Sequence, residues 1–181
     1  MKVSLVMPTI NVTTELELFL KSLRTQTYKD FELIVVDQNE GNEVFEIVKD
    51  YEEDFKIKYV KSDEKGLSLN RNRGLILMKG EIVGFPDDDC EYSPDTLEKV
   101  VEFFERKKNY RIYSCRTLER GKDYGTGVME KKDTEITKDS VDTTVKSITF
   151  FVNYGKDDII LFDENLGVGA TFGSGRKQTM C

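Results

Sequence analysis

Three consecutive acids, Asp87, Asp88 and Asp89, follow the apolar run at residues 82–85 after a single proline, Pro86. Adjacent carboxylates repel one another unless a positive group lies among them. Their oxygen atoms are the ligands that Mg²⁺ and Mn²⁺ prefer. On extended backbone alternate side chains point the same way, so we expect Asp87 and Asp89 to project together and Asp88 to turn aside. Two interpretations are open: a metal site, or a solvated acidic turn that closes a strand.

Two more polar groups stand at positions where they could do chemistry. Asp37 ends the apolar run at residues 34–36, where an acid either forms a turn or accepts a hydrogen bond from a nucleobase or ribose. Arg71 belongs to the segment Arg-Asn-Arg at residues 71–73, which follows Gly66. An arginine there either stacks on a base or grips a phosphate, or simply faces solvent on a helix.

Strand and helix patterns alternate along the part of the chain that would position these groups. Short apolar or alternating segments predict five strands, at residues 3–7, 31–36, 56–60, 81–85 and 111–114. Apolar residues at helical spacing predict helices near residues 16–23, 44–51, 67–78 and 97–104, although Gly74 weakens the third. This order favours a mostly parallel sheet with helices on both faces. Ligands bind beyond the carboxyl ends of such strands, so Asp37 and residues 87–89 are expected to face one crevice.

The composition limits the classes of function. With 181 residues, of which 38% are hydrophobic, the chain is long enough for one soluble, globular domain. Its net charge of −7 argues against broad nucleic-acid binding, which needs cations that neutralise phosphates. The chain has no histidine, which excludes Ser-His and Cys-His nucleophile pairs and histidine-ligated zinc.

The cellular location is predicted from the cysteines and from the N-terminal segment. Cys90, Cys115 and Cys181 show neither a CxxC spacing nor an even-numbered framework, which favours a reducing compartment. No apolar run reaches the ~18 residues that span a bilayer. Pro8 interrupts the N-terminal apolar run too early for a signal peptide. We therefore expect a cytoplasmic protein.

Four segments in chain order resemble the motifs of family 2 glycosyltransferases of the GT-A fold. They are residues 4–11 (Ser-Leu-Val-Met-Pro-Thr-Ile-Asn), 34–37 (Ile-Val-Val-Asp), 66–74 and 85–89, of which the last matches the DxD motif. The resemblance implies a Rossmann-like, three-layer α/β/α domain over residues 1–181, with a mostly parallel central sheet. Residues 1–116 would form its nucleotide-sugar-binding half, and residues 117–181 an incomplete acceptor-side half.

The resemblance also implies an activity and a set of binding residues. Family members move a sugar from a nucleoside diphosphate donor to an acceptor hydroxyl, usually with inversion. Nucleotide-sugar binding would fall to Pro8, Thr9, Asn11, Asp37, Arg71, Asp87 and Asp88. Within this set, Thr9 and Asp37 would line the base and ribose pocket, and Arg71 would contact the base. Asp89 and Asp87 would hold Mn²⁺ or Mg²⁺.

The partners follow from the same resemblance. The commonest donors of the family are UDP-sugars, and the acceptor would be a saccharide or a lipid-linked saccharide in bacterial polysaccharide or glycolipid assembly. A lipid-linked acceptor would bring the protein to the inner face of the membrane.

The resemblance fails in the second half of the chain. An inverting transfer needs a base for the acceptor's proton, and relatives place an acidic pair soon after segments like residues 162–167 and 172–175. Here Arg176 and Lys177 follow instead, and we expect a chain shortened at its C-terminus.

Three interpretations are open: an inactive truncated product, a fragment of a longer active enzyme, or a substitute base, Asp163 or Glu164. Those two residues equally suit an ordinary loop before a glycine turn. Truncation would leave apolar surface uncovered and favour self-association.

Rival functions belong to other classes. One is a degenerate transferase domain that binds the nucleotide without catalysis. Another is a metal-dependent nucleotidyltransferase, which residues 8–11 disfavour because they lack the glycines of a phosphate loop. A third is a structural module whose acids only keep it in solution.

Overall fold

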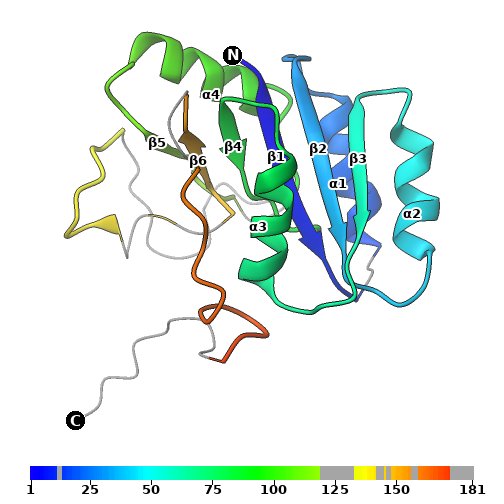
Figure 1. Cartoon of the computed structure of the whole chain (residues 1–181). Coiled ribbons are helices and arrows are strands. Elements are labelled where there is room, and N and C mark those ends of the chain that lie inside the picture. Colours follow the sequence, from blue (N-terminus) through cyan, green and yellow to red (C-terminus); the bar gives the residue numbers. More distant parts are fainter. Residues whose placement is uncertain (12–13, 119–132, 142–144, 146–147, 156–158, 172–181) are drawn as a thin grey trace.

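The computed structural model describes residues 1–11, 14–118, 133–141, 145, 148–155 and 159–171 of the chain. These residues contain a six-stranded sheet in the order β3-β2-β1-β4-β6-β5 (Figure 1). The strands are β1 Val3–Thr9, β2 Phe31–Asp37, β3 Lys56–Lys61, β4 Ile82–Gly84, β5 Ile112–Ser114 and β6 Phe150–Asn153. The helices are α1 Glu15–Arg24, α2 Glu43–Val48, α3 Leu67–Leu77 and α4 Thr96–Arg106, with a short 3₁₀ helix, η1, at Lys49–Tyr51.

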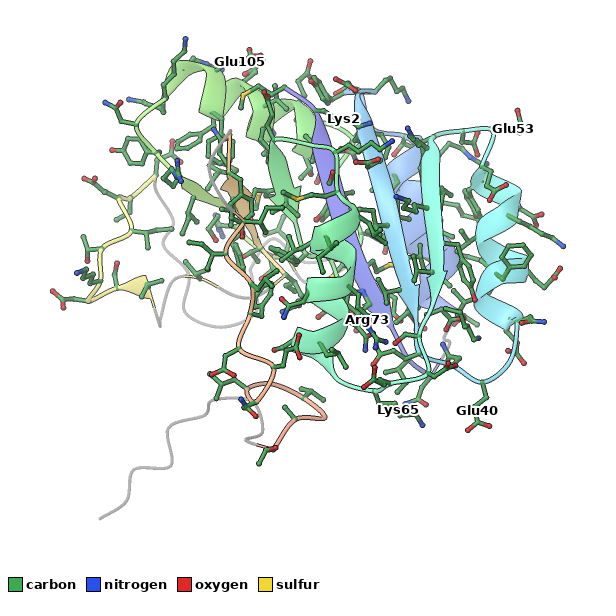
Figure 2. All side chains as sticks on the ribbon, viewed as in Figure 1. Lys2, Glu40, Glu53, Lys65, Arg73 and Glu105 are labelled. Atoms are coloured by element: carbon green, nitrogen blue, oxygen red, sulfur yellow. The ribbon has the colours of Figure 1, made fainter. Side chains whose placement is uncertain are left out.

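The sheet is mostly parallel, as predicted. β1 pairs in parallel with β2 and with β4, and β2 pairs in parallel with β3, whereas β6 is antiparallel to both of its neighbours. Parallel neighbours need crossover connections, which α1, α2 and α3 supply. The carboxyl ends of β1, β2 and β3 therefore share one edge. Figure 2 labels Glu40, Lys65 and Arg73 near this edge, and Lys2 and Glu53 near the opposite one.

Helices cover both faces of the sheet (Figure 1). Val3, Leu5 and Met7 of β1 are fully buried on the face to which α1 and α4 contribute their apolar residues. Val6, on the same strand, is buried on the opposite face with Leu75 of α3. Alternate residues of a strand point to opposite faces, so a strand covered on both sides needs apolar residues at nearly every position. This explains the near-continuous apolar runs of β1 and β2.

Gly74 lets α3 lie close to the sheet. A Cβ atom at this position would lie 2.3 Å from Cγ1 of Val6, far inside van der Waals contact. The glycine that weakens the helix pattern in the sequence is therefore compatible with the helix, because tertiary packing selects it. Close packing of α3 on β1 fixes the position of the polar residues on the first turns of the helix.

The second half of the chain departs from the predicted element bounds. The strands predicted at residues 81–85 and 111–114 are the shorter β4 and β5, and a sixth strand, β6, follows at Phe150–Asn153. Residues 119–132 and 172–181 lie outside the described residues. No helix in the described part of the chain is long and apolar enough to cross a membrane.

Candidate functional site

The ends of three strands meet at the carboxyl edge of the sheet. Thr9, the last residue of β1, is paired in register with Asp37, the last residue of β2. The buried hydroxyl of Thr9 donates a hydrogen bond to the carboxylate of Asp88, which follows β4. Partial burial raises the pKa of Asp88, the hydrogen bond from Thr9 opposes that effect, and the neighbouring charge of Asp89 adds to it. Segments far apart in the sequence thus share one edge, as predicted.

The three acids form a turn, which contradicts the expected side-chain alternation. The backbone N–H of Cys90 donates to the carbonyl oxygen of Asp87 at 3.3 Å. Because the chain turns here instead of continuing as a strand, alternate side chains do not share a side. Asp88 points at Thr9 rather than away from the site, and Asp89 is the most exposed of the three acids.

The carboxylate of Asp37 is fully buried and fully hydrogen-bonded. Its Oδ2 atom accepts from the hydroxyl of Tyr59 at 2.6 Å and from Nζ of Lys61 at 2.9 Å. Its Oδ1 atom accepts from the backbone N–H of Asn39 at 2.9 Å and from Nδ2 of Asn39 at 2.7 Å. Burial raises the pKa of Asp37, but these donors outweigh it, and the pKa lies below its ordinary value. Asp37 thus presents no free acceptor, and it holds Asn39 and Lys61 in place.

The loop after β2 is tied to the neighbouring segments. Asn39 accepts at Oδ1 a hydrogen bond of 2.7 Å from the backbone N–H of Asn11, whose φ of 59° lies in the left-handed region. Gln38 accepts at Oε1 a bond of 2.9 Å from the backbone N–H of Gly66, just before α3. The backbone N–H of Gln38 donates to the carbonyl of Thr9 at 3.0 Å. One loop therefore links β1, β2 and the start of α3.

Arg71 on α3 is a buried cation whose donors are incompletely used. The residue is 4% exposed, and its Nε and Nη2 atoms have no hydrogen-bond partner among the described residues. Nη2 lies 3.6 Å from Oδ1 of Asp87, an ion pair without a hydrogen bond. Burial lowers the pKa of Arg71, and Asp87 opposes this effect. Burial raises the pKa of Asp87, Arg71 lowers it, and the two neighbouring acids raise it again.

Aromatic rings flank the guanidinium of Arg71. The Cζ atom lies 5.6 Å from the ring centroid of Phe85 and 5.6 Å from that of Phe162. The two rings meet edge to face, with centroids 5.0 Å apart. A ring face attracts a cation at such distances, which offsets part of the cost of burying the charge.

A segment of the second half, residues 159–171, docks on α3. Asn72 exchanges two hydrogen bonds with the backbone of Phe162, and its Nδ2 atom also donates to Oε1 of Glu164 at 2.9 Å. Ser68 donates to the carbonyl of Leu166, and the backbone N–H of Leu67 donates to that of Val168 at 3.1 Å. Residues 159–171 are thereby fixed against the helix that carries Arg71.

The two candidate bases already have partners in this segment. Oδ1 of Asp163 accepts from the backbone N–H and from Nδ2 of Asn165, both at 3.0 Å, and Glu164 accepts from Asn72. These contacts are those of a structured loop. The catalytic role of Asp163 or Glu164 stays a prediction, and the glycine segment at residues 172–175 lies outside the described residues.

The acids of the turn suit a metal ion that takes its other ligands from a bound phosphate compound and from water. Within the described ranges no three His, Cys, Asp or Glu side chains are grouped as metal ligands. Asp89 is exposed and the side chain of Asp87 is 43% exposed, so both can offer oxygens at the rim. A hard cation such as Mg²⁺ is often held by one or two carboxylates together with phosphate oxygens and water. Asp87 and Asp89 suit that arrangement.

Sequence reasoning missed several residues of this edge: Gln38, Asn39, Tyr59, Lys61, Asn72 and Phe162. Gln38 and Asn39 directly follow Asp37, and Asn72 follows Arg71, so adjacency to a polar motif was the available signal. Nothing local marks Tyr59 or Phe162, because their roles depend on contacts with residues 22 and 90 positions away.

A sequence model described as Glycosyl transferase family 2 matches residues 4–159. Among curated proteins, the chain is 32% identical over 143 residues to the GalNAc(5)-diNAcBac-PP-undecaprenol beta-1,3-glucosyltransferase of Campylobacter jejuni. That match covers 76% of this chain and 46% of the relative. The chain aligns with less than half the length of the other curated relatives as well.

Solved structures share the fold. Staphylococcus aureus TarS 1-349 in complex with UDP superposes with a TM-score of 0.79 at 24% identity, covering 93% of this chain and 52% of that chain. This likeness confirms the predicted GT-A architecture. The mannosyltransferase PcManGT of Pyrobaculum calidifontis, in complex with GDP-Man and Mn²⁺, gives a TM-score of 0.60 at 26% identity, covering 66% of this chain and 36% of that chain.

Proposed function

This chain belongs to glycosyl transferase family 2, and from this membership we propose that it binds a nucleoside diphosphate sugar at the carboxyl edge of its sheet. The sugar is then transferred to a hydroxyl group of a saccharide or lipid-linked acceptor. The activity of the chain and its acceptor are part of this proposal, because the chain spans less than half of its curated relatives.

The observation that supports donor binding most strongly is the incompletely paired guanidinium of Arg71. A buried polar group that lacks a hydrogen bond costs about 1–3 kcal/mol, and more when it is charged. Among the described residues, Arg71 leaves two nitrogens in that state, beside the carboxylate of Asp87. A ligand with acceptor atoms at this edge would complete the hydrogen bonding of Arg71 and offset that cost.

Each residue of the edge has a role in the proposal. Arg71 donates to the nucleobase, while Thr9 closes the pocket of base and ribose from β1 and orients Asp88. Asp37 acts through the groups that it holds, because its own oxygens are already occupied. Pro8 and Asn11 shape the exit of β1, and Asp87 lies near the ribose or the sugar.

Mn²⁺ or Mg²⁺, held by Asp89 and Asp87, would supply positive charge to the leaving diphosphate. The chain's own contribution is to place both carboxylates at the rim. Burial raises the pKa of Asp87, and the guanidinium of Arg71 opposes this effect. The solved complexes of TarS with UDP and of PcManGT with GDP-Man and Mn²⁺ support a metal-assisted nucleotide site. UDP is the first donor nucleotide to test, because it is the commonest in the family.

Isothermal titration calorimetry of the Asp89→Asn variant tests the metal site. UDP, GDP and CDP are titrated into the wild-type chain with and without Mn²⁺. We expect Mn²⁺ to strengthen the binding of one nucleotide by roughly tenfold or more in the wild type, and to have no effect in Asp89→Asn. Asp30→Asn is the matched control, because it removes the same charge from the opposite edge of the sheet, where Asp30 precedes β2. Retained Mn²⁺ dependence in Asp89→Asn would refute the assignment.

A further inference from the structure

The orientation of the Arg71 guanidinium depends on its neighbours rather than on its own hydrogen bonds at Nε and Nη2. In the described part of the chain these two nitrogens have no hydrogen-bond partner, and Oδ1 of Asp87 lies 3.6 Å from Nη2 without a hydrogen bond. Besides this ion pair, two rings flank the planar group: the centroids of Phe85 and Phe162 each lie 5.6 Å from Cζ. Without one ring, the side chain would be free to turn its donors toward other acceptors.

Phe162 reaches this position through Asn72, the residue next to Arg71. The backbone N–H of Phe162 donates to Oδ1 of Asn72 at 2.8 Å, and Nδ2 of Asn72 donates to the carbonyl of Phe162 at 3.0 Å. Asn72 is 3% exposed, so water competes little for these bonds. The amide side chain thus binds the backbone of a segment 90 residues away in the same way that a neighbouring strand would.

The segment around Phe162 is fixed at both of its ends. Before Phe162, the hydroxyl of Tyr154 donates to the carbonyl of Ile160 at 3.1 Å. After it, Gly167 lies so close to α3 that a Cβ atom would meet Oγ of Ser68 at 3.0 Å, and its φ of +115° disfavours a side chain. Phe162 therefore has little freedom to leave the guanidinium.

We propose that Asn72 and Phe162 are positioning residues for donor binding: together they hold the guanidinium of Arg71 in one orientation, in which Nε and Nη2 stay unpaired and shielded from water until the nucleotide binds. This inference rests on the proposed function and adds to it a contribution from the acceptor-side half of the chain. We call Asn72 and Phe162 together the Phe162 clamp. Neither residue needs to touch the donor, since both act through Arg71.

Calorimetry with UDP and Mn²⁺ on matched variants tests the clamp. Phe162→Leu removes the ring, and we expect its dissociation constant to rise roughly tenfold, the scale of one partly desolvated cation–π contact. Phe162→Tyr keeps the ring and should bind as the wild type does. Phe150→Leu is the control, because Phe150 also packs on Phe85, with centroids 5.5 Å apart, but does not flank Arg71. Its affinity should match that of the wild type.

Hydrogen exchange at Nε of Arg71, followed by NMR in the ligand-free chain, provides a second measurement. The clamp predicts slow exchange at Nε in the wild type and in Phe162→Tyr. In Phe162→Leu and Asn72→Ala water gains access to the guanidinium, and exchange should be roughly tenfold faster. Thermal melts of the same samples show whether each variant is folded. Phe150→Leu controls for a general loss of stability.

The outcomes separate this inference from the proposed function. A wild-type chain that binds no nucleotide contradicts both. A wild-type chain that binds while Phe162→Leu binds equally well contradicts the clamp alone, as does unchanged exchange at Nε in that variant. Weaker binding in Phe162→Leu with rescue by Phe162→Tyr supports the clamp, since a purely structural role would weaken Phe150→Leu as well.

Discussion

The carboxylate of Asp37 lies 0% exposed at the end of β2, and four hydrogen bonds keep it ionised there. Burial disfavours its charge, but Tyr59, Asn39 and Lys61 together favour it more, so its pKa is lowered. The same interaction raises the pKa of Tyr59, for which burial is the larger cause. At the scale of the residue, this buried charge organises the rim of the candidate site without facing the ligand.

Replacing Asp37 by Asn should destabilise the chain in a pH-dependent way. The side-chain NH₂ of the new Asn would face the donor groups of Tyr59, Asn39 and Lys61 where Asp37 has an acceptor oxygen. We therefore expect the free energy of unfolding at pH 7 to fall by about 1–3 kcal/mol. A lowered native pKa means that the folded chain binds fewer protons than the unfolded chain near the ordinary value of 3.8. The stabilisation is therefore present above that value and is lost as the pH falls through the native pKa.

Urea denaturation of wild type and Asp37→Asn between pH 7 and pH 3 measures this difference. The gap between the two should be widest at neutral pH and narrow on acidification. Asp30→Asn, an exposed acid outside such a network, should stay within about 0.5 kcal/mol of the wild type throughout. A gap that grew toward low pH would contradict the assigned direction.

Helix α3 is the element on which the site depends. It carries Arg71 and Asn72 on its buried side, receives the hydrogen bonds of the segment at residues 159–171, and packs on β1 through Gly74. Its first N–H groups are also used, since Leu67 donates to Val168. A displacement of this helix from the sheet would move Arg71 relative to the acids after β4.

Substitution of Gly74 tests this dependence. In Gly74→Ala the new methyl group meets the side chain of Val6, and we expect a loss of about 1–3 kcal/mol from overpacking, despite the better helix propensity of alanine. Nucleotide affinity should fall as well, because α3 must shift. Chemical denaturation and calorimetry measure the two effects.

Ile76→Ala is the control on the same helix, because Ile76 is 71% exposed. It should change the free energy of unfolding by less than about 0.5 kcal/mol. A Gly74→Ala variant as stable as the wild type would contradict the claim that α3 packs too close to β1 for a side chain at position 74.

At the scale of the whole molecule, the candidate site joins the two halves of the chain. The sheet buries apolar side chains on both faces, whereas the carboxyl edge gathers polar groups from β1, β2, α3 and the turn after β4. The segment at residues 159–171 contacts this edge through α3. A ligand bound there would contact segments that come together only in the folded chain, so it should stabilise the fold.

We expect the nucleotide that binds to raise the melting temperature. At a concentration a hundred times the dissociation constant, binding adds about 2.7 kcal/mol to the native state. For a chain of this length that corresponds to a rise of roughly 5–10 °C. Differential scanning fluorimetry with UDP, GDP and CDP, each with Mn²⁺ and again with EDTA, measures the shift. The absence of a shift with every nucleotide would favour a structural module over a transferase.

Much of this molecule could be predicted from local sequence. The apolar runs of β1 and β2 and the helical spacing in α1 and α4 identify elements, because the period of buried residues follows from backbone geometry. Their order indicates a parallel sheet, and a parallel sheet places the ends of its strands at one edge. The positions of Asp37 and residues 87–89 at that edge followed without any knowledge of side-chain contacts.

The sequence by itself determined that Asp37 and residues 87–89 reach the edge, and only the tertiary structure decided what they contact there. Asp88 faces Thr9, 79 residues away, because the acids form a turn rather than a strand. Phe162 covers Arg71 because Asn72 binds its backbone across 90 residues. Such contacts depend on how separate segments pack, and no local period encodes them.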